Sequence, residues 1–322
     1  MDKISDMGKT YIPLEERTGR RPPVFFTRDL SEKGLEKILK RIRYALNGKI
    51  AIKVQTGEPH NPPPIPPSWV KYLMAADLPQ ATIVTTDPYC EGEGYSDRKG
   101  REARRIQGWT FSPVEIMDSE GAAALPLKGG KWFSEMSVGK SLLNYNSMLV
   151  LTNFKYPSTG GFRGANQSVG LDCADRKIGH ALIHTAPDAD ESSETTGPEL
   201  IEKITESAKA AADFFRGHIG YINVMKNHPA SCPSEGPNTA TPTPDSGILG
   251  SLDILAIDQA CIDLIWNRSP NERSSLIENL DRHHGLRQLS YMKELGMGHD
   301  SYELIDIDHE DDILTPPLAA QG

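Results

Sequence analysis

A glycine-rich segment in the middle of the chain has the residue types of an anion-binding loop. Residues 153–168 read NFKYPSTGGFRGANQS and directly follow an apolar run at 148–152. Open parallel sheets bind ligands at the carboxyl ends of their strands, where backbone N–H groups and cations can hold a carboxylate or a phosphate. Lys155 and Arg163 supply such cations. The sequence therefore predicts a site for a small anionic substrate, with an exposed glycine-rich turn as the alternative.

Two histidines, His180 and His184, stand four residues apart in the sequence GHALIH. This spacing places both side chains on one face of a helix, as in some zinc sites, or on one face of a strand. The segment lacks the acidic partners of a zinc site, so we expect no metal pair here. We predict His184 as an acid–base catalyst, because an imidazole titrates near neutrality. A hydrogen-bonded structural histidine is the alternative.

A second polar segment, KVQTGEPHNPPP at residues 53–64, follows the strand predicted at 50–54. We expect its polar side chains at the same strand-end rim as Lys155, because the carboxyl ends of parallel strands share one edge of a sheet. A polar loop stiffened by prolines is the alternative reading. Lys53, Glu58 and Asp258 are expected to orient the catalytic histidine.

The predicted site thus combines candidate catalytic residues with candidate substrate-binding residues, and no metal ligand is predicted. The catalytic candidates are His184, Lys155 and Glu58. The substrate-binding candidates are Lys53, Thr56, Gly160, Gly161, Arg163, Gly164, Asn166, Gln167 and Asp258.

The four cysteines, Cys90, Cys173, Cys232 and Cys261, are too widely spaced for a disulfide scaffold. A four-iron cluster needs four thiolates, usually in closely spaced groups, so we do not expect an iron–sulfur cluster. Cys261 has apolar neighbours and is expected to be buried. The identity of any cofactor stays open, a mononuclear metal included.

Composition and charge indicate a globular protein that acts on small molecules. Hydrophobic residues make up 38% and charged residues 25% of the 322 positions. The net charge of −9 argues against a nucleic-acid partner, which normally requires a basic face. No apolar run approaches the roughly 20 residues that cross a bilayer, and the polar start is unlike a signal peptide. We therefore expect no membrane partner and a cytoplasmic location; the oligomeric state stays open.

Strand and helix patterns alternate along the chain. Strands are predicted at 23–28, 50–54, 81–86, 113–117, 148–152 and 219–225, and helices at 31–46, 68–76, 97–107, 199–216 and 258–266. Alternation of this kind predicts an α/β fold, with mainly parallel sheets and helices on both faces. We expect two lobes, at 23–150 and 151–310, with a crevice between them. A flexible arm at 1–22, an acidic loop at 185–198, a long polar loop at 226–247 and a tail at 311–322 complete the predicted organisation.

Ordered sequence markers run along most of the chain: KVQTGEP, VEIMD, LPLKGGK, MLVLTNFK, GGFRG, ALIH, YINVM and DSGILGSLDILAIDQAC. In these markers the chain resembles the domain of unknown function 362 family, often described as uncharacterised iron–sulfur centre proteins. Many members carry an added ferredoxin-type cluster domain, which we do not expect here. The resemblance implies a shared fold and, by the family's description, a redox centre.

The chain departs from that family's pattern where ligand-type residues are expected. Gln55 stands where a histidine precedes TGE, and residues 156–157 stand where a histidine follows FKG. Residues 166–167 replace a lysine, and residues 231–236 (SCPSEG) replace CDCDGH. The glycine-rich segment is also similar to that of the nickel-pincer lactate racemases, whose lysine carries the cofactor. Gln167 at that position implies that no cofactor is attached covalently in this chain.

Three functions follow from these patterns, in order of preference. The first is an enzyme that acts on a small anionic metabolite in the crevice, by acid–base or redox chemistry and without a classical iron–sulfur cluster. The second, which the family description implies, is an iron–sulfur or metal-centre protein for redox or electron transfer. The third is a non-catalytic protein that binds a ligand or a partner through its acidic and polar loops.

Overall fold

The computed structural model describes residues 11–56, 63, 65–86, 104–155, 161–185, 195–226 and 245–320. Most of the predicted acidic loop (186–194) and of the predicted polar loop (227–244) lies outside these ranges. Two residues of the predicted site, Glu58 and Gly160, also lie outside the described residues.

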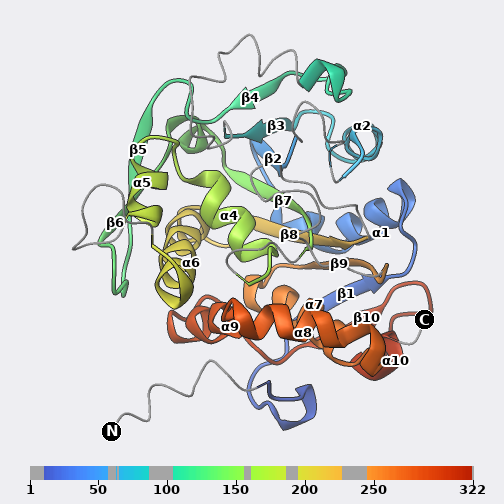
Figure 1. Cartoon of the computed structure of the whole chain (residues 1–322). Coiled ribbons are helices and arrows are strands. Elements are labelled where there is room, and N and C mark those ends of the chain that lie inside the picture. Colours follow the sequence, from blue (N-terminus) through green and yellow to red (C-terminus); the bar gives the residue numbers. More distant parts are fainter. Residues whose placement is uncertain are drawn as a thin grey trace, which may run out of the picture.

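Nine strands form one mixed, mainly parallel sheet in the order β11-β10-β1-β9-β8-β7-β2-β3-β4 (Figure 1). Its strands are β1 (Pro23–Thr27), β2 (Ile50–Val54), β3 (Thr82–Thr85), β4 (Val114–Ile116), β7 (Ser147–Asn153), β8 (Ile219–Met225), β9 (Gly247–Ser251), β10 (Glu303–Asp306) and β11 (Asp312–Leu314). Only β9 and β11 run antiparallel to their neighbours within this sheet. The six predicted strands and the α/β class are therefore confirmed.

The helices of the described residues include α1 (Glu32–Ile42), α2 (Pro67–Ala76), α4 (Ala165–Cys173), α5 (Gly179–His184), α6 (Gly197–Phe214), α7 (Ile254–Trp266), α8 (Pro270–Arg282), α9 (Gly285–Glu294) and α10 (Pro316–Ala320). Helix α1 begins at the cap Ser31, whose side chain accepts the N–H groups of Lys33 and Gly34. Its buried face carries leucine and isoleucine at helical spacing, as the sequence predicts.

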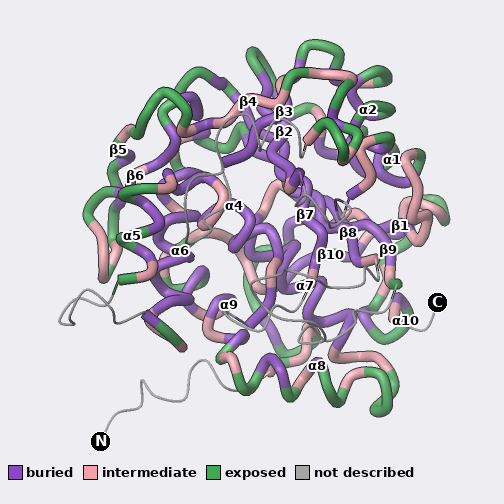
Figure 2. The backbone as a smooth tube through the Cα atoms, turned by 45° about the horizontal axis from the view of Figure 1, so that its top comes forward, coloured by how far each residue is buried: buried purple, intermediate pink, exposed green. Residues whose placement is uncertain are grey.

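The sheet is buried on both faces, which explains why its central strands are continuous apolar runs. All seven residues of β7 are buried. The side chains of its four apolar residues, 148–151, alternate between two hydrophobic clusters. Leu149 and Leu151 pack with α1 and α2, whereas Met148 and Val150 pack with α4, α6, α7 and α9. In Figure 1, α1 and α2 lie to the right of the central strands and α4 and α6 to the left, and Figure 2 shows the central strands as buried.

A two-stranded antiparallel hairpin, β5 (Ala122–Pro126) and β6 (Glu135–Gly139), is not part of the large sheet. It lies against α5 and α6 on the side of the sheet that α4 covers (Figure 1). The sequence patterns do not predict this hairpin. Strand β5 (AAALP) consists mainly of alanine, which is depleted in strands, and polar residues interrupt β6 (EMSVG), so neither shows the typical pattern of a central strand.

The segment at 11–22 is attached to α7, although the sequence predicts it as part of a flexible arm. Arg17 is 7% exposed and forms two hydrogen bonds of 2.7 Å with Asp263 of α7. The ring of Tyr11 stacks on Trp266 with the ring centroids 4.2 Å apart. A buried ion pair and an aromatic stack therefore hold this segment in place.

The large sheet joins strands from both sides of position 150, and β7 itself spans that position. The expected division into two lobes at this point stays a prediction. The expected C-terminal tail contributes β11 and α10 to the structure. None of the helices in the described part of the chain is long and apolar enough to cross a membrane.

Candidate functional site

The carboxyl ends of β2, β3, β7 and β8 lie at one edge of the sheet, because these strands are parallel neighbours. We call this the carboxyl edge. Thr56, Thr86 and Lys155 lie within two residues of the ends of β2, β3 and β7, so the structure brings the predicted Thr56 and Lys155 to one edge. The carbonyl of Thr56 accepts a hydrogen bond from Trp109 Nε1 at 2.9 Å. In an open parallel sheet this is the edge at which ligands bind.

Three ionisable side chains, Lys53, Arg163 and Asp172, form a cluster that we call the charge triad. Lys53 of β2 is fully buried, and its Nζ contacts the Asp172 carboxylate. A guanidinium nitrogen of Arg163 donates to both oxygens of Asp172, at 2.7 and 2.6 Å. The side chains of Arg163 and Asp172 remain 12% and 18% exposed. The triad therefore extends from the interior at Lys53 to the surface.

The charges of the triad shift the pKa values of Lys53 and Asp172. Burial lowers the pKa of Lys53, the attraction of Asp172 opposes this, and the charge of Arg163 adds to the lowering. Burial raises the pKa of Asp172, but attraction to Arg163 and Lys53 outweighs it and holds the pKa at about 2. Asp172 is thus ionised at neutral pH, and Lys53 releases its proton more easily than an exposed lysine does.

Asp258 of α7 occupies the N-terminus of α4, which the sequence predicts as a place for a substrate anion. Its carboxylate accepts the backbone N–H groups of Ala165 and Asn166 at 2.7 and 2.9 Å, and Asn223 Nδ2 at 2.8 Å. A carboxylate at this position also interacts favourably with the helix dipole. Full burial raises the pKa of Asp258 to about 6, against the lowering effect of these hydrogen bonds. The first N–H groups of α4 are therefore bound to the protein's own carboxylate.

Asn166 and Gln167 are buried side chains on the first turn of α4, 0% and 3% exposed. Asn166 Nδ2 donates to Thr205 Oγ1 of α6 at 3.0 Å. Asn166 thus ties α4 to α6, and substrate binding by these two residues stays a prediction.

The stems of the glycine-rich loop are held together by backbone and side-chain contacts. Lys155 and Arg163 exchange two backbone hydrogen bonds, of 3.2 and 2.7 Å. The rings of Phe154 and Phe162 stack beside them, with the centroids 5.5 Å apart. Gly161 has a φ of +81°, and a Cβ there would lie 2.4 Å from the backbone of α9. The loop therefore needs glycine at this position for packing as well as for conformation.

His180 and His184 lie on α5, so the segment that is compatible with a helix or a strand is a helix. Their rings stack with centroids 5.9 Å apart and planes inclined by 9°. Burial lowers the pKa of His180, whereas the nearby carboxylates of Asp172, Asp118 and Asp175 act in the opposite direction. The His180 ring is also hydrogen-bonded to the backbone of Leu171, the residue before Asp172, so His180 lies beside the charge triad.

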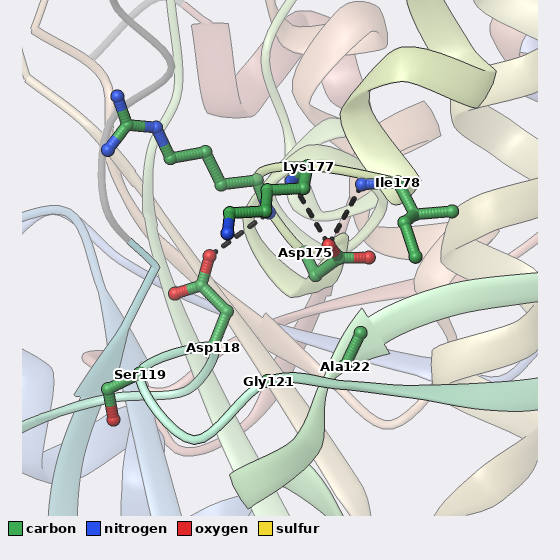
Figure 3. A pocket seen from close by; sticks show the side chains of 8 residues that line it. Asp118, Ser119, Gly121, Ala122, Asp175, Lys177 and Ile178 are labelled. Atoms are coloured by element: carbon green, nitrogen blue, oxygen red, sulfur yellow. Dashed lines mark hydrogen bonds between the residues drawn. The ribbon is translucent and has the colours of Figure 1, made fainter. Parts of the chain in front are cut away.

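A surface pocket lies between the segment after β4 and the turn that joins α4 to α5 (Figure 3). It has a volume of about 410 Å³ and is lined by Asp118, Ser119, Gly121, Ala122, Asp175, Arg176, Lys177 and Ile178. Asp175 accepts the backbone N–H groups of Lys177 and Ile178, both at 3.0 Å. The backbone N–H of His180 donates to the carbonyl of Asp175 at 3.0 Å, so this pocket lies next to the buried His180.

Cys173 of α4 and Cys261 of α7 are buried free thiols. Burial raises the pKa of Cys173 to about 12 and that of Cys261 well above its usual value, so both are uncharged at neutral pH. Cys90 and Cys232 lie outside the described residues. Within the described ranges, no group of three or more His, Cys, Asp or Glu side chains is placed to hold a metal ion.

The sequence patterns do not predict Asp172, the residue that joins Lys53 to Arg163. Its only local signal is an acidic side chain in an otherwise apolar helical stretch, SVGLDCA. Such a residue needs a partner when it is buried, but the partner Lys53 is 119 positions away in the chain. Thr86 is a further residue at this place, and its hydroxyl donates to the carbonyl of Asp172 at 3.2 Å.

Comparisons with known proteins match one family model and a distantly similar solved structure. The family described as "Domain of unknown function (DUF362)" matches residues 50–263. A similar solved structure is the lactate racemase apoprotein from Thermoanaerobacterium thermosaccharolyticum, with a TM-score of 0.40 and 12% sequence identity. That likeness covers 92% of this chain and 85% of the other chain. No curated protein matches the chain significantly.

Proposed function

The chain belongs to the DUF362 family, and we propose that it is an enzyme that transfers a proton to or from a small anionic metabolite at the carboxyl edge. The charge triad is the observation that carries this proposal, because in it a fully buried lysine and an arginine share one carboxylate. Perturbed groups of this kind occur preferentially at functional sites.

Arg163 is the group that we assign to the anionic part of the substrate. With Lys53 protonated, the triad contains two positive charges and one negative charge, so an anion beside Arg163 would balance it. A guanidinium suits this role, because its planar donors match a carboxylate or a phosphate. The Arg163 side chain is 12% exposed, and its Nε has no hydrogen-bond partner among the described residues.

Lys53 is the group that we assign as the proton store. Burial and the charge of Arg163 both favour its neutral form. A substrate anion beside Arg163 offsets that repulsion, so substrate binding and proton uptake by Lys53 are coupled. His184, which is half-buried at the end of α5, then exchanges protons with the substrate. Lys155 adds positive charge at the same edge.

Proton transfer can be tested before the substrate is identified. The protein is incubated in D₂O with 2-hydroxy carboxylates, 2-oxo carboxylates or sugar phosphates, one at a time, and NMR follows the replacement of C–H by C–D. We expect exchange for at least one compound. Lys53→Met, Arg163→Met and His184→Gln should each lower its rate by about 100-fold or more, as for loss of an acid–base group.

Lys293→Met is the matched control, because Lys293 is an exposed lysine whose Nζ is paired with Asp300 at 2.7 Å. This variant should exchange at the wild-type rate. The proposal fails if no anion in the set exchanges, or if the three site variants retain the rate of the control.

A further inference from the structure

Lys203 of α6 is a buried lysine that the proposed reaction does not use. It is 2% exposed, and its Nζ donates to the carbonyl of Thr185 at 2.8 Å and to the hydroxyl of Thr195 at 3.2 Å. Its charge is paired with Glu199, at 2.8 Å. Two of its donors are thus hydrogen-bonded and its charge is compensated by the ion pair, so the buried ammonium is fixed in position.

Two partners of Lys203 are adjacent to the backbone of His184. Thr185 follows His184 directly, and the backbone N–H of Thr195 donates to the carbonyl of His184 at 2.7 Å. Helix α5 has only six residues, and helices of this length are not stable on their own. A cation at the carbonyl end of a helix is favourable because it interacts with the helix dipole. Lys203 and Thr195 therefore hold the last turn of α5, which carries His184.

The hairpin also contacts Lys203, through the ring of Trp132 at its tip. Glu206 accepts the backbone N–H groups of Lys131, Trp132 and Phe133, at distances between 2.6 and 3.1 Å. Glu202 accepts Trp132 Nε1 at 2.9 Å. The indole is thus locked, with the Lys203 Nζ 5.3 Å from its ring centroid, a distance at which a cation and an aromatic ring attract each other.

From these contacts we infer that Lys203 is a positioning residue for His184, with Trp132 holding the ammonium in place. The inference rests on the proposed function in one respect, the catalytic role of His184. This role gives a reason for the many contacts between the hairpin tip and α6. The tip places the Trp132 ring against Lys203, and Lys203 binds the end of α5.

The test compares Lys203→Met with Lys209→Met, the matched control. Lys209 lies on the same helix and is paired with an acid four residues away, Asp213, at 2.9 Å. ¹⁵N NMR of the imidazole groups reports the tautomer of His184 and the pH at which it titrates. We expect Lys203→Met to change both, with titration at higher pH because a positive charge is removed, and to slow exchange on the order of tenfold or more. Lys209→Met should change neither.

Thr195→Val keeps the side-chain shape and removes one hydrogen bond, so it covers the case in which Lys203→Met does not fold. It should shift the His184 signals in the same direction, by a smaller amount. Unchanged His184 signals in the folded Lys203 variant, or in Thr195→Val if only that variant folds, would overturn the inference. Changed signals in a protein whose wild type exchanges no proton would refute the proposed function and leave the positioning role supported.

Discussion

Gly164 lies directly against the carboxylate of Asp258, so that a Cβ on Gly164 would stand 2.3 Å from Oδ1. Such a contact is possible only for glycine, because no other residue lets the carboxylate approach the backbone so closely. This closeness allows Asp258 to bind the N–H groups of Ala165 and Asn166. The glycine predicted to admit a substrate anion therefore admits an anion of the protein itself.

We expect Gly164→Ala to lower the free energy of unfolding by about 1–3 kcal/mol, the usual cost of an added methylene in a packed site. Denaturant unfolding measures this cost. A double-mutant cycle with Asp258→Ala assigns its cause, because removal of the carboxylate also removes the atoms that the new methyl group would meet. Equal costs of Gly164→Ala in both backgrounds would show that the carboxylate is not the obstacle.

The pH dependence of stability should contain a contribution from Asp258, whose pKa burial raises from 3.8 to about 6. Between these values the folded state binds more protons than the unfolded state, so stability falls as pH rises. The fall is roughly 3 kcal/mol for a shift of this size. Unfolding of the wild type and of Asp258→Asn is measured from pH 4 to 6.5. The variant should gain stability relative to the wild type over this range, and a constant difference would contradict the raised pKa.

The central strands could be predicted from the sequence because their signal is local. A strand that is buried on both faces is mostly apolar, and 148–152 and 219–225 show this without any knowledge of their neighbours, with Thr152 and Asn223 as polar exceptions. The fold class follows from the alternation of such runs with helical patterns. The hairpin β5–β6 lacks a clear strand signal, because β5 consists mainly of alanine and polar residues interrupt β6. The contacts that its tip forms with Glu202 and Glu206 are nonlocal.

The candidate site was only partly predictable, because its electrostatics depend on pairs that are distant in the chain. The residue types of Lys53 and Arg163 indicated an anion site, but Asp172, which pairs with both, is 119 positions from Lys53. The position of Asp258 near Gly164 is equally nonlocal, since Ala165 and Asp258 are 93 positions apart. Single-residue patterns show which groups need partners; only the fold determines which partners they have.

Removal of different members of the charge triad should have very unequal effects on stability. Asp172→Asn leaves two cations without a carboxylate and should cost about 3–5 kcal/mol, as for a broken buried ion pair. Lys53→Met leaves Arg163 and Asp172 paired and replaces a buried ammonium with an apolar chain, so we expect a change within about 1 kcal/mol. Chemical denaturation of both variants is the measurement. Similar losses for the two variants would contradict the shared carboxylate.

Arg17 holds the segment at 11–22 against α7 through its ion pair with Asp263. Asp263 is fully buried and also accepts Tyr302 Oη at 2.7 Å, but Arg17 is its cationic partner. Arg17→Met would leave that carboxylate buried without a counter-charge, so we expect a loss of about 3–5 kcal/mol in the free energy of unfolding. The stack of Tyr11 on Trp266 should loosen as well, which changes the tryptophan fluorescence and speeds hydrogen exchange in this segment.

Arg20→Met is the matched control for this experiment, because Arg20 is an exposed arginine of the same segment. Surface substitutions of this kind usually change stability by less than about 0.5 kcal/mol. The double variant Arg17→Met/Asp263→Asn should recover part of the loss, because the uncompensated charge is then absent. If Arg17→Met and Arg20→Met have the same free energy of unfolding, the contacts of Arg17 do not stabilise the fold. The expected flexible arm then describes the segment better. If only Arg17→Met is destabilised and the double variant recovers, the N-terminal segment is an integral part of the fold.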